Sequence, residues 1–421
     1  MRPQRAPALA LAGLLFFGGD LSAQETPRSV DLEEALRLLH ENSPEMALAR
    51  SRVREAEGRA LQAKAYPNPS ISATHEALEG AGPDPSETYL NLSQRVEWPG
   101  TRSARSRAAD RGLEAARGRF AADSLRLVFE VRRTYLESAA GAERLDVLEE
   151  VSAVFREAAG RADERFAGGD VSRYARDRIR LERVRYERGL AAARVELDAA
   201  RRALGALILP GEGGAAATEG LPDGLPPRLE AEGPGPEAVD RHPTVVAARS
   251  GVEALGAEAD LARSLRLPDP TLTGGYKTQS NGFDGLFVGI SLPLPILDRR
   301  GGAITAAEAR LGAERSRLDL ARRSVERELR RAGARYRALR AQAELVGEGF
   351  VESGSALLET ARVAYREGEM ELVELLDAAS ARRDAGILST QLLADVWTSY
   401  YELIRASGGS DAGSGSERHE R

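Results

Sequence analysis

The stretch "YLNLSQRVEWPGTR", Tyr89 to Arg102, differs in pattern from the rest of the chain, which consists mainly of Ala, Arg, Glu and Leu. Its apolar residues are separated by polar ones and fall on even-numbered positions: Leu90, Leu92, Val96 and Trp98. A period of two is typical of a β-strand with one apolar and one polar face, whereas an α-helix repeats every 3.6 residues. The stretch therefore predicts a strand that ends at the "PGTR" segment.

The composition excludes several classes of protein. Hydrophobic residues make up 42% of the chain and charged residues 29%, which is incompatible with general disorder. The net charge is -6 and the two signs are interspersed along the chain, so no nucleic-acid partner is expected. The chain has no cysteine, which excludes disulfides, thiolate metal ligands and an acylated N-terminal Cys.

The N-terminus has the pattern of a secretory signal peptide. Arg2 and Arg5 precede the apolar run "ALALAGLLFF" (Ala8–Phe17), and small residues precede a cleavage position after Ala23. The alternative is a transmembrane anchor, but a spanning helix needs about 20 apolar residues, and this run is shorter. We therefore expect the protein to be exported from the cytoplasm.

The chain contains an internal duplication with an offset of about 200 residues. "ENSPEMALARSRVREAEGRALQAKAYPNPSISA" (Glu41–Ala73) is echoed by "VDRHPTVVAARSGVEALGAEADLARSLRLPDPTLTG" (Val239–Gly274). "RFAGGDV" (Arg165–Val171) is echoed by "AYREGEM" (Ala364–Met370). The expected division of the chain is a signal peptide 1–23, a first repeat 24–209, a Gly/Pro-rich connector 210–240, a second repeat 241–406 and a disordered tail 407–421.

Each repeat is predicted to contain a helix, two short strands and two long helices in that order. The long helices contain no internal proline and would extend about 95–100 Å at 1.5 Å per residue, so we expect them to pack side by side as in coiled coils. The strands are expected at Ser70–Leu78, at the opening stretch, around Leu272–Tyr276 and at Leu286–Leu294. The helices are expected at Leu32–Ala65, Arg102–Phe166, Val171–Ile208, Gly302–Tyr365 and Glu369–Ser407.

The four strands suggest a membrane barrel built from several chains. Each has an apolar and a polar face and about nine to eleven residues, the length that a tilted strand needs to cross a bilayer. Four strands cannot close a barrel with a lumen, because even small closed barrels use about eight. The alternation fits equally well a small soluble sheet with one face on a core.

Four segments resemble the TolC-like outer-membrane efflux factors over essentially all of the mature chain: "SVDLEEALRLLHENSPEMALARS", "YPNPSISATHE", "YLNLSQRVEWPGTR" and "YREGEMELVELLDAASARRDA". The resemblance implies a mainly α-helical homotrimer with a twelve-stranded membrane β-barrel that continues into a coiled-coil-like α-helical tunnel. It implies a passive exit duct in the outer membrane, joined through a periplasmic adaptor (membrane fusion) protein to an inner-membrane transporter.

One pattern within the opening region resembles the branch that exports heavy-metal cations. It consists of Glu87, Leu92, Ser93, Gln94, Glu97, Gly100, Arg102 and Arg105. The cargo would then be heavy-metal cations, with drugs as the alternative. Many family members are lipidated on an N-terminal Cys, and this chain, which has none, is not expected to be.

The resemblance also implies roles for residues near two turns. Glu374 and Asp377 match two acidic positions that ring the periplasmic entrance of the tunnel, where six carboxylates in a trimer would attract cations. Without the resemblance, an acidic helix N-terminus stabilised by the helix dipole explains them equally well. The hairpin tips expected to dock the adaptor contain Gly168, Gly169, Val171, Gly368 and Met370.

The alternation predicts which side chains of the barrel face lipid. These are Leu90, Leu92, Val96, Trp98, Val288, Ile290 and Leu292. Tyr89 and Trp98 are expected to bracket their strand as the interface aromatics of a barrel do.

The sequence shows no recognisable catalytic or metal-binding constellation. The four histidines lie far apart, none pairs with a second at i+3 or i+4, and each is expected to be a surface or capping residue: His40, His75, His242 and His419. His75 is a partial exception, because it interrupts the apolar side of the first strand and is expected at a strand end or facing the lumen. No enzymatic activity, cofactor or metal site is therefore expected. The alternative functions are a soluble periplasmic coiled-coil or adaptor protein and, within the family, the exit channel of a type I secretion system.

Overall fold

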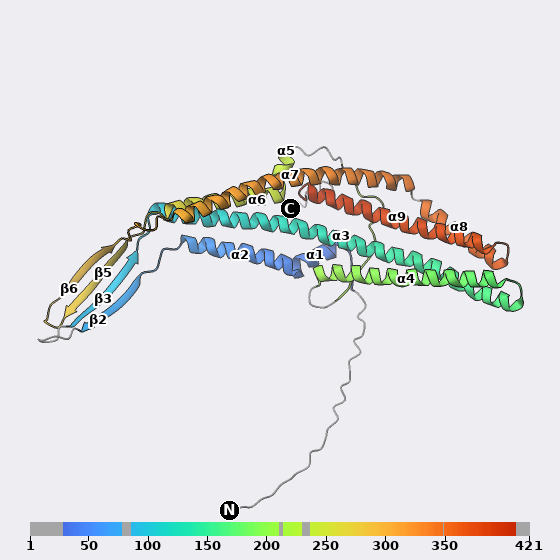
Figure 1. Cartoon of the computed structure of the whole chain (residues 1–421), viewed down its shortest axis with the longest axis horizontal. Coiled ribbons are helices and arrows are strands. Elements are labelled where there is room, and N and C mark those ends of the chain that lie inside the picture. The colour runs from blue at the N-terminus through green and yellow to red at the C-terminus, as the bar shows by residue number, and fades with distance from the viewer. Residues whose placement is uncertain (1–27, 78–85, 210–213, 230–235, 348, 410–421) are drawn as a thin grey trace, which may run out of the picture.

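The computed structural model of the chain is elongated, with a small sheet at one end and helices along the rest of its length (Figure 1). The structure describes residues 28–77, 86–209, 214–229, 236–347 and 349–409. The predicted signal peptide and residues 410–421 of the predicted tail lie outside the described residues. Within the described ranges, no helix combines the length and the apolar character that crossing a membrane requires.

The first repeat begins with a short strand and one helix that is divided in two. Its elements are β1 (Arg28–Val30), α1 (Leu32–Asn42), α2 (Pro44–Lys64), β2 (Ser70–Ala77), β3 (Ser86–Arg95), α3 (Pro99–Gly168) and α4 (Arg173–Ile208). The single helix predicted over Leu32–Ala65 is wrong, because the residue before a proline is held out of the helical conformation. Ser43 accordingly has ψ 125°, and its Oγ accepts a hydrogen bond from the Met46 amide (3.4 Å), which caps α2.

The second repeat has the same order, with a divided long helix. Its elements are β4 (Ala216–Thr218), α5 (Pro236–Arg241), α6 (Pro243–Ser264), β5 (Thr271–Gln279), β6 (Asp284–Ser291), α7 (Gly301–Val346), α8 (Gly349–Glu367) and α9 (Leu372–Ala406). The continuous helix predicted over Gly302–Tyr365 is wrong, because Gly347 ends α7 with φ +68° and ψ 169°. The connector is also more regular than predicted, since β4 and α5 lie in or next to it.

The four predicted strands form one antiparallel sheet in the order β2-β3-β5-β6. The two hairpins join through β3 and β5, whose register places Leu90 opposite Tyr276. β3 ends at Arg95, so Val96 and Trp98, which the alternation placed within the strand, follow it. Within the described part of the chain β2 and β6 each pair with a single neighbour, so both edges of the sheet are free there.

The segments that connect the sheet to the helices are held by a buried aspartate, Asp269. Asp269 accepts hydrogen bonds from Arg95 (2.7 and 3.0 Å), and its side chain is only 3% exposed. The Trp98 indole nitrogen donates to the Pro268 carbonyl (2.9 Å) at the start of α3. A charged pair of this geometry fixes the angle at which the strands pass into the long helices.

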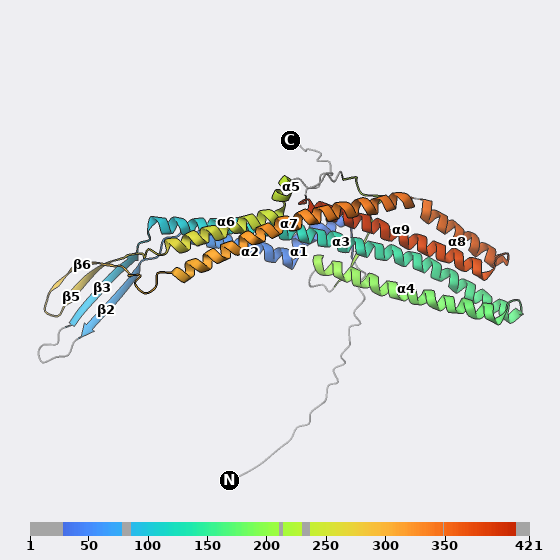
Figure 2. The same ribbon diagram turned by 45° about the horizontal axis from the view of Figure 1, so that its top comes forward.

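The helices form one elongated assembly, and different helices pack against one another at its two ends. Near the sheet α3 packs against α2 and α6, and α6 against α7. Away from the sheet the contacts run in the order α4–α3–α9–α8, and Figure 2 shows these four helices side by side. Both hairpin tips, between α3 and α4 and between α8 and α9, lie at the end opposite the sheet (Figures 1 and 2).

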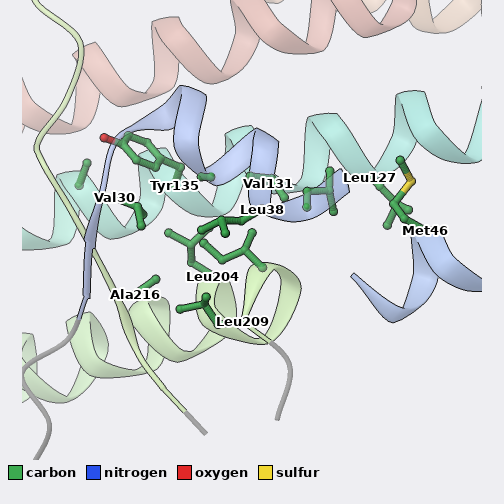
Figure 3. Close-up of a cluster of buried hydrophobic side chains, with 13 residues drawn as sticks. Val30, Leu38, Met46, Leu127, Val131, Tyr135, Leu204, Leu209 and Ala216 are labelled. Atoms are coloured by element: carbon green, nitrogen blue, oxygen red, sulfur yellow. The ribbon is translucent and has the colours of Figure 1, made fainter. Parts of the chain in front are cut away.

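A compact core lies midway along the molecule, where α1, α3 and α4 meet the parallel pair β1 and β4 (Figure 3). Its fully buried members include Val30, Leu204, Ile208 and Ala216. Gly205 lies here against the returning connector, and a Cβ at this position would lie 2.0 Å from the Gly214 carbonyl oxygen. Neither β1 nor β4 shows a periodic pattern in the sequence, because each has only three residues.

The described part of the connector is held against the second repeat by side-chain donors. The Trp397 indole donates to the Gly224 carbonyl (3.0 Å), the Tyr336 hydroxyl donates to the Pro227 carbonyl (2.7 Å), and Arg228 pairs with Glu344 (2.9 Å). These contacts bind the connector to α7 and α9. Of these residues, Glu344 lies in the last turn of α7, next to the break between α7 and α8.

Candidate channel wall and entrance

One face of the sheet is an uncovered apolar surface. The register places Leu90 and Leu92 of β3 in rows with Ala73 and Ile71 of β2. The rows continue through β5 to Leu286 and Val288 of β6, and Ile290 of β6 lies in the next row, opposite Leu272 of β5. Leu90 is 52% exposed and Val288 87%, since none of the described helices covers this face. An apolar patch of this kind marks a surface that contacts another protein or a membrane.

The opposite face of the sheet is polar and internally paired. Lys277 forms an ion pair with Glu87 (2.8 Å), and the hydroxyls of Ser93 and Thr273 are 3.0 Å apart across the β3–β5 pair. The sheet therefore has one wet and one apolar side, as the alternation predicted. The Glu87–Lys277 pair was missed in the sequence, because its two residues are distant in the chain and their pairing depends on the strand register.

Tyr89 lies on the polar face, not at a strand end. It is the fourth residue of β3, its hydroxyl donates to Glu87, and its ring meets Phe287 edge-to-face with centroids 6.2 Å apart. The prediction that Tyr89 brackets the strand is wrong, because β3 begins at Ser86 and Tyr89 lies within it, on the face of Asn91 and Ser93. Trp98 does lie beyond the strand end and is 44% exposed.

The remaining predicted lipid-facing residues lie next to the strands. Val96 follows β3, and its amide donates to the Pro270 carbonyl (2.9 Å). Leu292 follows β6, directly before Pro293, and is exposed. Both residues therefore lie at the end of the sheet that joins the helices.

The three described histidines occupy separate places, as predicted, and His419 lies outside the described residues. His75 lies in the apolar rows, where its Nδ1 is 2.8 Å from the Thr88 hydroxyl. His242 is the N-cap of α6, as the predicted capping role requires. It is buried, however, and so is not a surface residue. Its Nδ1 accepts from the Thr244 amide (3.2 Å), so its Nε2 donates to the Arg405 carbonyl (3.0 Å). Burial lowers the pKa of this imidazole. In the described ranges, no three His, Cys, Asp or Glu side chains are grouped as a metal site would require.

The two acidic residues predicted at the entrance lie in the first turns of α9. Glu371 caps the helix, and the Glu374 carboxylate accepts a hydrogen bond from the Glu371 amide (3.0 Å), which completes a capping box. Asp377 is exposed one turn later, and both acids lie away from the buried Leu375. In a single chain, the role of an acidic residue at a helix N-terminus accounts for Glu374. Asp377 makes no hydrogen bond or ion pair within the described ranges.

The two hairpin turns have the same backbone geometry, as the duplication predicts. Gly169 has φ +86° and Gly368 has φ +83°, a conformation that glycine adopts without steric cost. A Cβ at either position would meet no atom within 4 Å, so the surface beside each turn is open. Val171 and Met370 are half-buried, and Met370 packs against the cluster formed by α3, α4, α8 and α9.

Charges near the first turn are held in local ion pairs. Arg176 donates to Asp177 (2.7 and 2.9 Å), and this contact lowers the pKa of the carboxyl. Arg180 pairs with Asp163 of α3 (2.8 Å) and stabilises the hairpin. The arrangement as a whole offers two free sheet edges, one apolar sheet face, one polar sheet face and two open turns, which suits a wall better than a reaction centre.

Comparison with known proteins agrees with this geometry. The family described as "Outer membrane efflux protein" matches residues 35–174 and 235–409. The cobalt-zinc-cadmium resistance protein CzcC of Cupriavidus metallidurans is 25% identical over 390 residues, which cover 91% of each chain. The nickel-cobalt-cadmium resistance protein NccC of Alcaligenes xylosoxydans xylosoxydans is 28% identical over 75% of this chain and 72% of its own. The crystal structure of the CmeC outer membrane channel of Campylobacter jejuni superposes with a TM-score of 0.76 at 17% identity, over 96% of this chain and 94% of that one. The chain therefore belongs to the outer membrane efflux protein family.

Proposed function

We propose that three copies of this chain form an outer-membrane exit duct for a tripartite efflux system. The observation that carries the proposal is the sheet, which has an uncovered apolar face and an unpaired strand at each edge, β2 and β6. Unpaired backbone groups cannot remain in a bilayer, so the free edges must pair. Pairing β6 of one copy with β2 of the next closes a barrel of twelve strands, as in the family.

The two faces of the sheet then have different surroundings. Leu90, Leu92, Val288 and Ile290 would face lipid, while the Glu87–Lys277 pair and Ser93 would face water in the lumen. Val96, Trp98 and Leu292 would lie near the periplasmic interface, where the strands pass into the helices. The helices would extend into the periplasm as a tunnel.

We assign heavy-metal cations as the cargo. CzcC and NccC are named for resistance to cobalt, zinc, cadmium and nickel, and they match this chain over most of its length. A duct contributes no energy, so a periplasmic adaptor and an inner-membrane transporter would supply the cargo. The turns with Gly168, Gly169 and Val171, and with Gly368 and Met370, would meet the adaptor at the open end.

The decisive experiment is expression in a host that lacks its own exit duct for metal efflux. Together with its adaptor and transporter, the protein should restore export of zinc, cobalt or cadmium and should migrate as a trimer in the outer-membrane fraction. Recovery as a soluble periplasmic monomer would overturn the proposal. Gly169→Trp should abolish export while the trimer persists, and unimpaired export would place adaptor docking elsewhere.

Glu374 and Asp377 would line the closed entrance and favour cations. In planar bilayers, Glu374→Gln with Asp377→Asn should lower the preference for cations over anions, because six carboxylates leave the axis of the trimer. A matched control, Asp319→Asn with Glu326→Gln on α7, removes the same charge far from the tips and should leave selectivity unchanged. An unchanged preference in the first variant would remove these residues from the entrance.

A further inference from the structure

The link between β6 and α7, residues 292–300, is an exposed segment that carries both apolar and basic side chains. It has nine residues, whereas the link between β3 and α3, Val96–Trp98, has three. Every residue of the longer link is exposed, and Leu297 is fully so. The sequence of the link is "LPLPILDRR", with four apolar side chains followed by one acid and two arginines. Apolar side chains next to basic ones are typical of a surface that lies at a membrane interface.

The apolar part of the link extends the uncovered face of the sheet. That face carries even-numbered residues of β6, and Leu292, Leu294 and Ile296 continue the alternation beyond the end of the strand. The chain then turns, since the Ile296 amide donates to the Leu294 carbonyl (2.9 Å), before α7 begins. The link therefore lies where the apolar face of the sheet ends and the helices begin (Figure 2).

The arginines of the link are not used within the described part of the chain. In the first repeat, Arg102 at the start of α3 stacks on the Tyr66 ring, with its Cζ 3.7 Å from the ring centroid. Across the described ranges, the side chains of Arg299 and Arg300 make no ion pair or hydrogen bond. The one acid of the link, Asp298, accepts a hydrogen bond from the Arg300 amide (2.7 Å). With two arginines and one aspartate, the link has a net charge of +1.

Arg300 has a backbone conformation that favours glycine. Its φ is 59° and its ψ is 22°, and among the described residues other than glycine it is the one with a positive φ. Glycine adopts this conformation without steric cost, and two glycines follow Arg300 directly. An arginine that is placed here at a conformational cost indicates that its guanidinium group has a role.

We propose that the link binds anionic phospholipids of the periplasmic leaflet of the outer membrane. Leu294, Ile296 and Leu297 contact the acyl chains, and Arg299 and Arg300 bind the headgroup phosphate. A guanidinium group matches the geometry of a phosphate, and basic residues next to apolar ones favour anionic over zwitterionic lipid.

The inference rests on the proposed trimeric duct, in which the other candidate for covering the link is a neighbouring copy. Pairing of β6 with β2 of the next copy brings the link beside residues 65–69 of that copy, which precede β2. This segment has the sequence "AYPNP" and contains no carboxylate that could neutralise the two arginines. Charge complementarity therefore favours lipid, which supplies both acyl chains and a negative charge.

Native mass spectrometry of the trimer purified in detergent tests the proposal. The trimer is titrated with phosphatidylglycerol or with zwitterionic phosphatidylcholine, and the wild type should bind one phosphatidylglycerol per copy in preference to phosphatidylcholine. Arg299→Gln with Arg300→Asn removes both charges, and asparagine tolerates the left-handed backbone of position 300. Each basic residue near an anionic lipid contributes about fivefold in affinity, so this variant should bind phosphatidylglycerol about 25-fold more weakly.

The matched control removes two other exposed arginines of α7. Arg315→Gln with Arg323→Gln changes the net charge by the same amount, but the nearer of the two lies 15 residues, or about 22 Å, along the helix from Arg300. This separation exceeds the distance of about 10 Å over which salt screens exposed charges, so the control should bind phosphatidylglycerol as the wild type does.

The outcomes separate this inference from the proposed function. Weaker binding of phosphatidylglycerol in the first variant alone supports the lipid site. Equal binding of both lipids by the wild type, or equal affinities in the two variants, overturns the site and leaves the duct intact. Loss of the trimer in the first variant alone would assign the link to a contact between copies and would also overturn the lipid site. Displacement of phosphatidylglycerol by inorganic phosphate at matched ionic strength would identify free phosphate as the ligand instead. Absence of a trimer in the wild type would overturn the proposed function and, with it, this inference.

Discussion

The two helical hairpins are built on one plan but are packed differently. In the first hairpin Phe155 of α3 stacks on Tyr186 of α4, with ring centroids 4.4 Å apart and an angle of 11° between the planes. The repeat offset of 199 carries these residues to Gly354 and Ala385 of the second hairpin. A Cβ on Gly354 would lie 3.2 Å from the Ala385 Cβ, so α8 and α9 meet there through the smallest side chains.

The long helices differ in the same region. α3 continues through Leu148, which is buried beside Leu190 of α4. The equivalent position in the second repeat is Gly347, where α7 ends and the chain turns before α8. The first hairpin is therefore a continuous rod joined by aromatic stacking, and the second is a closely packed pair of helices separated from the rest of its long helix. Duplication conserved the path of the chain while the side-chain packing of the two copies diverged.

Truncating the aromatic stack should have the largest effect. Phe155→Ala removes a fully buried ring and leaves a cavity between α3, α4 and α9, at a cost of about 3–5 kcal/mol in the free energy of unfolding. The midpoint of thermal unfolding in detergent, followed by circular dichroism, measures it. Leu388→Ala on α9, at a half-exposed position, is the control and should change stability by less than about 0.5 kcal/mol. Equal effects would mean that the stack does not hold the first hairpin together.

A substitution where the connector crosses α4 should lower stability almost as much. Gly205→Ala places a methyl group 2.0 Å from the Gly214 carbonyl oxygen, which only a backbone shift relieves, so we expect a loss of about 3 kcal/mol. The second repeat has Ile404 at the equivalent position. Gly189→Ala on the same helix meets no neighbour and should gain up to about 1 kcal/mol from helix propensity. Unfolding midpoints that fall equally in both variants would contradict the close approach.

The break between α7 and α8 should respond less strongly. Gly347 has φ +68° and ψ 169°. Residues other than glycine adopt this region at a cost of about 1–3 kcal/mol. Gly347→Ala should therefore lower the free energy of unfolding by this amount and lower the unfolding midpoint accordingly. Gly160→Ala in the continuous α3 is the matched control and should be neutral or stabilising. If the Gly347 variant is as stable as the control, the break does not depend on this backbone conformation.

The regular parts of the fold were predictable, because hydrophobic period and repetition are local or self-similar signals. The alternation in β3 and the duplicated turns at Gly169 and Gly368 are found where the sequence placed them. The divided helices were not predicted, although proline follows Ser43 and glycine occupies position 347. The β1–β4 pair depends on residues almost 190 apart that show no period.

The candidate site was predictable to different degrees at its two ends. The apolar and polar faces of the sheet follow from strand alternation, whereas Tyr89 does not lie at a strand end and Val96, Trp98 and Leu292 lie beyond the strands. At the other end, the positions of Glu374 and Asp377 near the tip are visible in one chain, but their convergence on an axis depends on neighbouring copies. Their role at the entrance stays a prediction, since a capping box explains one of the two in the isolated chain.

The smallest expected difference between the repeats is in how their stability depends on pH. Equivalent positions cap α2 and α6, but the first is Ser43, which does not titrate, and the second is His242. Burial lowers the pKa of His242, so the folded state keeps the imidazole neutral while the unfolded chain begins to bind a proton near pH 6.5. The stabilising contribution is complete above that pH and is lost as the pH falls below it, by at most about 1.4 kcal/mol per pH unit.

Replacing the second cap by the first isolates this effect. His242→Ser should flatten the decrease of the unfolding midpoint between neutral and mildly acidic pH, although it also removes the hydrogen bond to the Arg405 carbonyl and lowers stability at neutral pH. His40→Ser, on an exposed histidine of α1, is the control and should leave the pH dependence unchanged. An acid sensitivity that persists in the His242 variant would assign it to other groups. A flattened profile would mean that one repeat carries a proton-sensitive helix cap that its duplicate lacks.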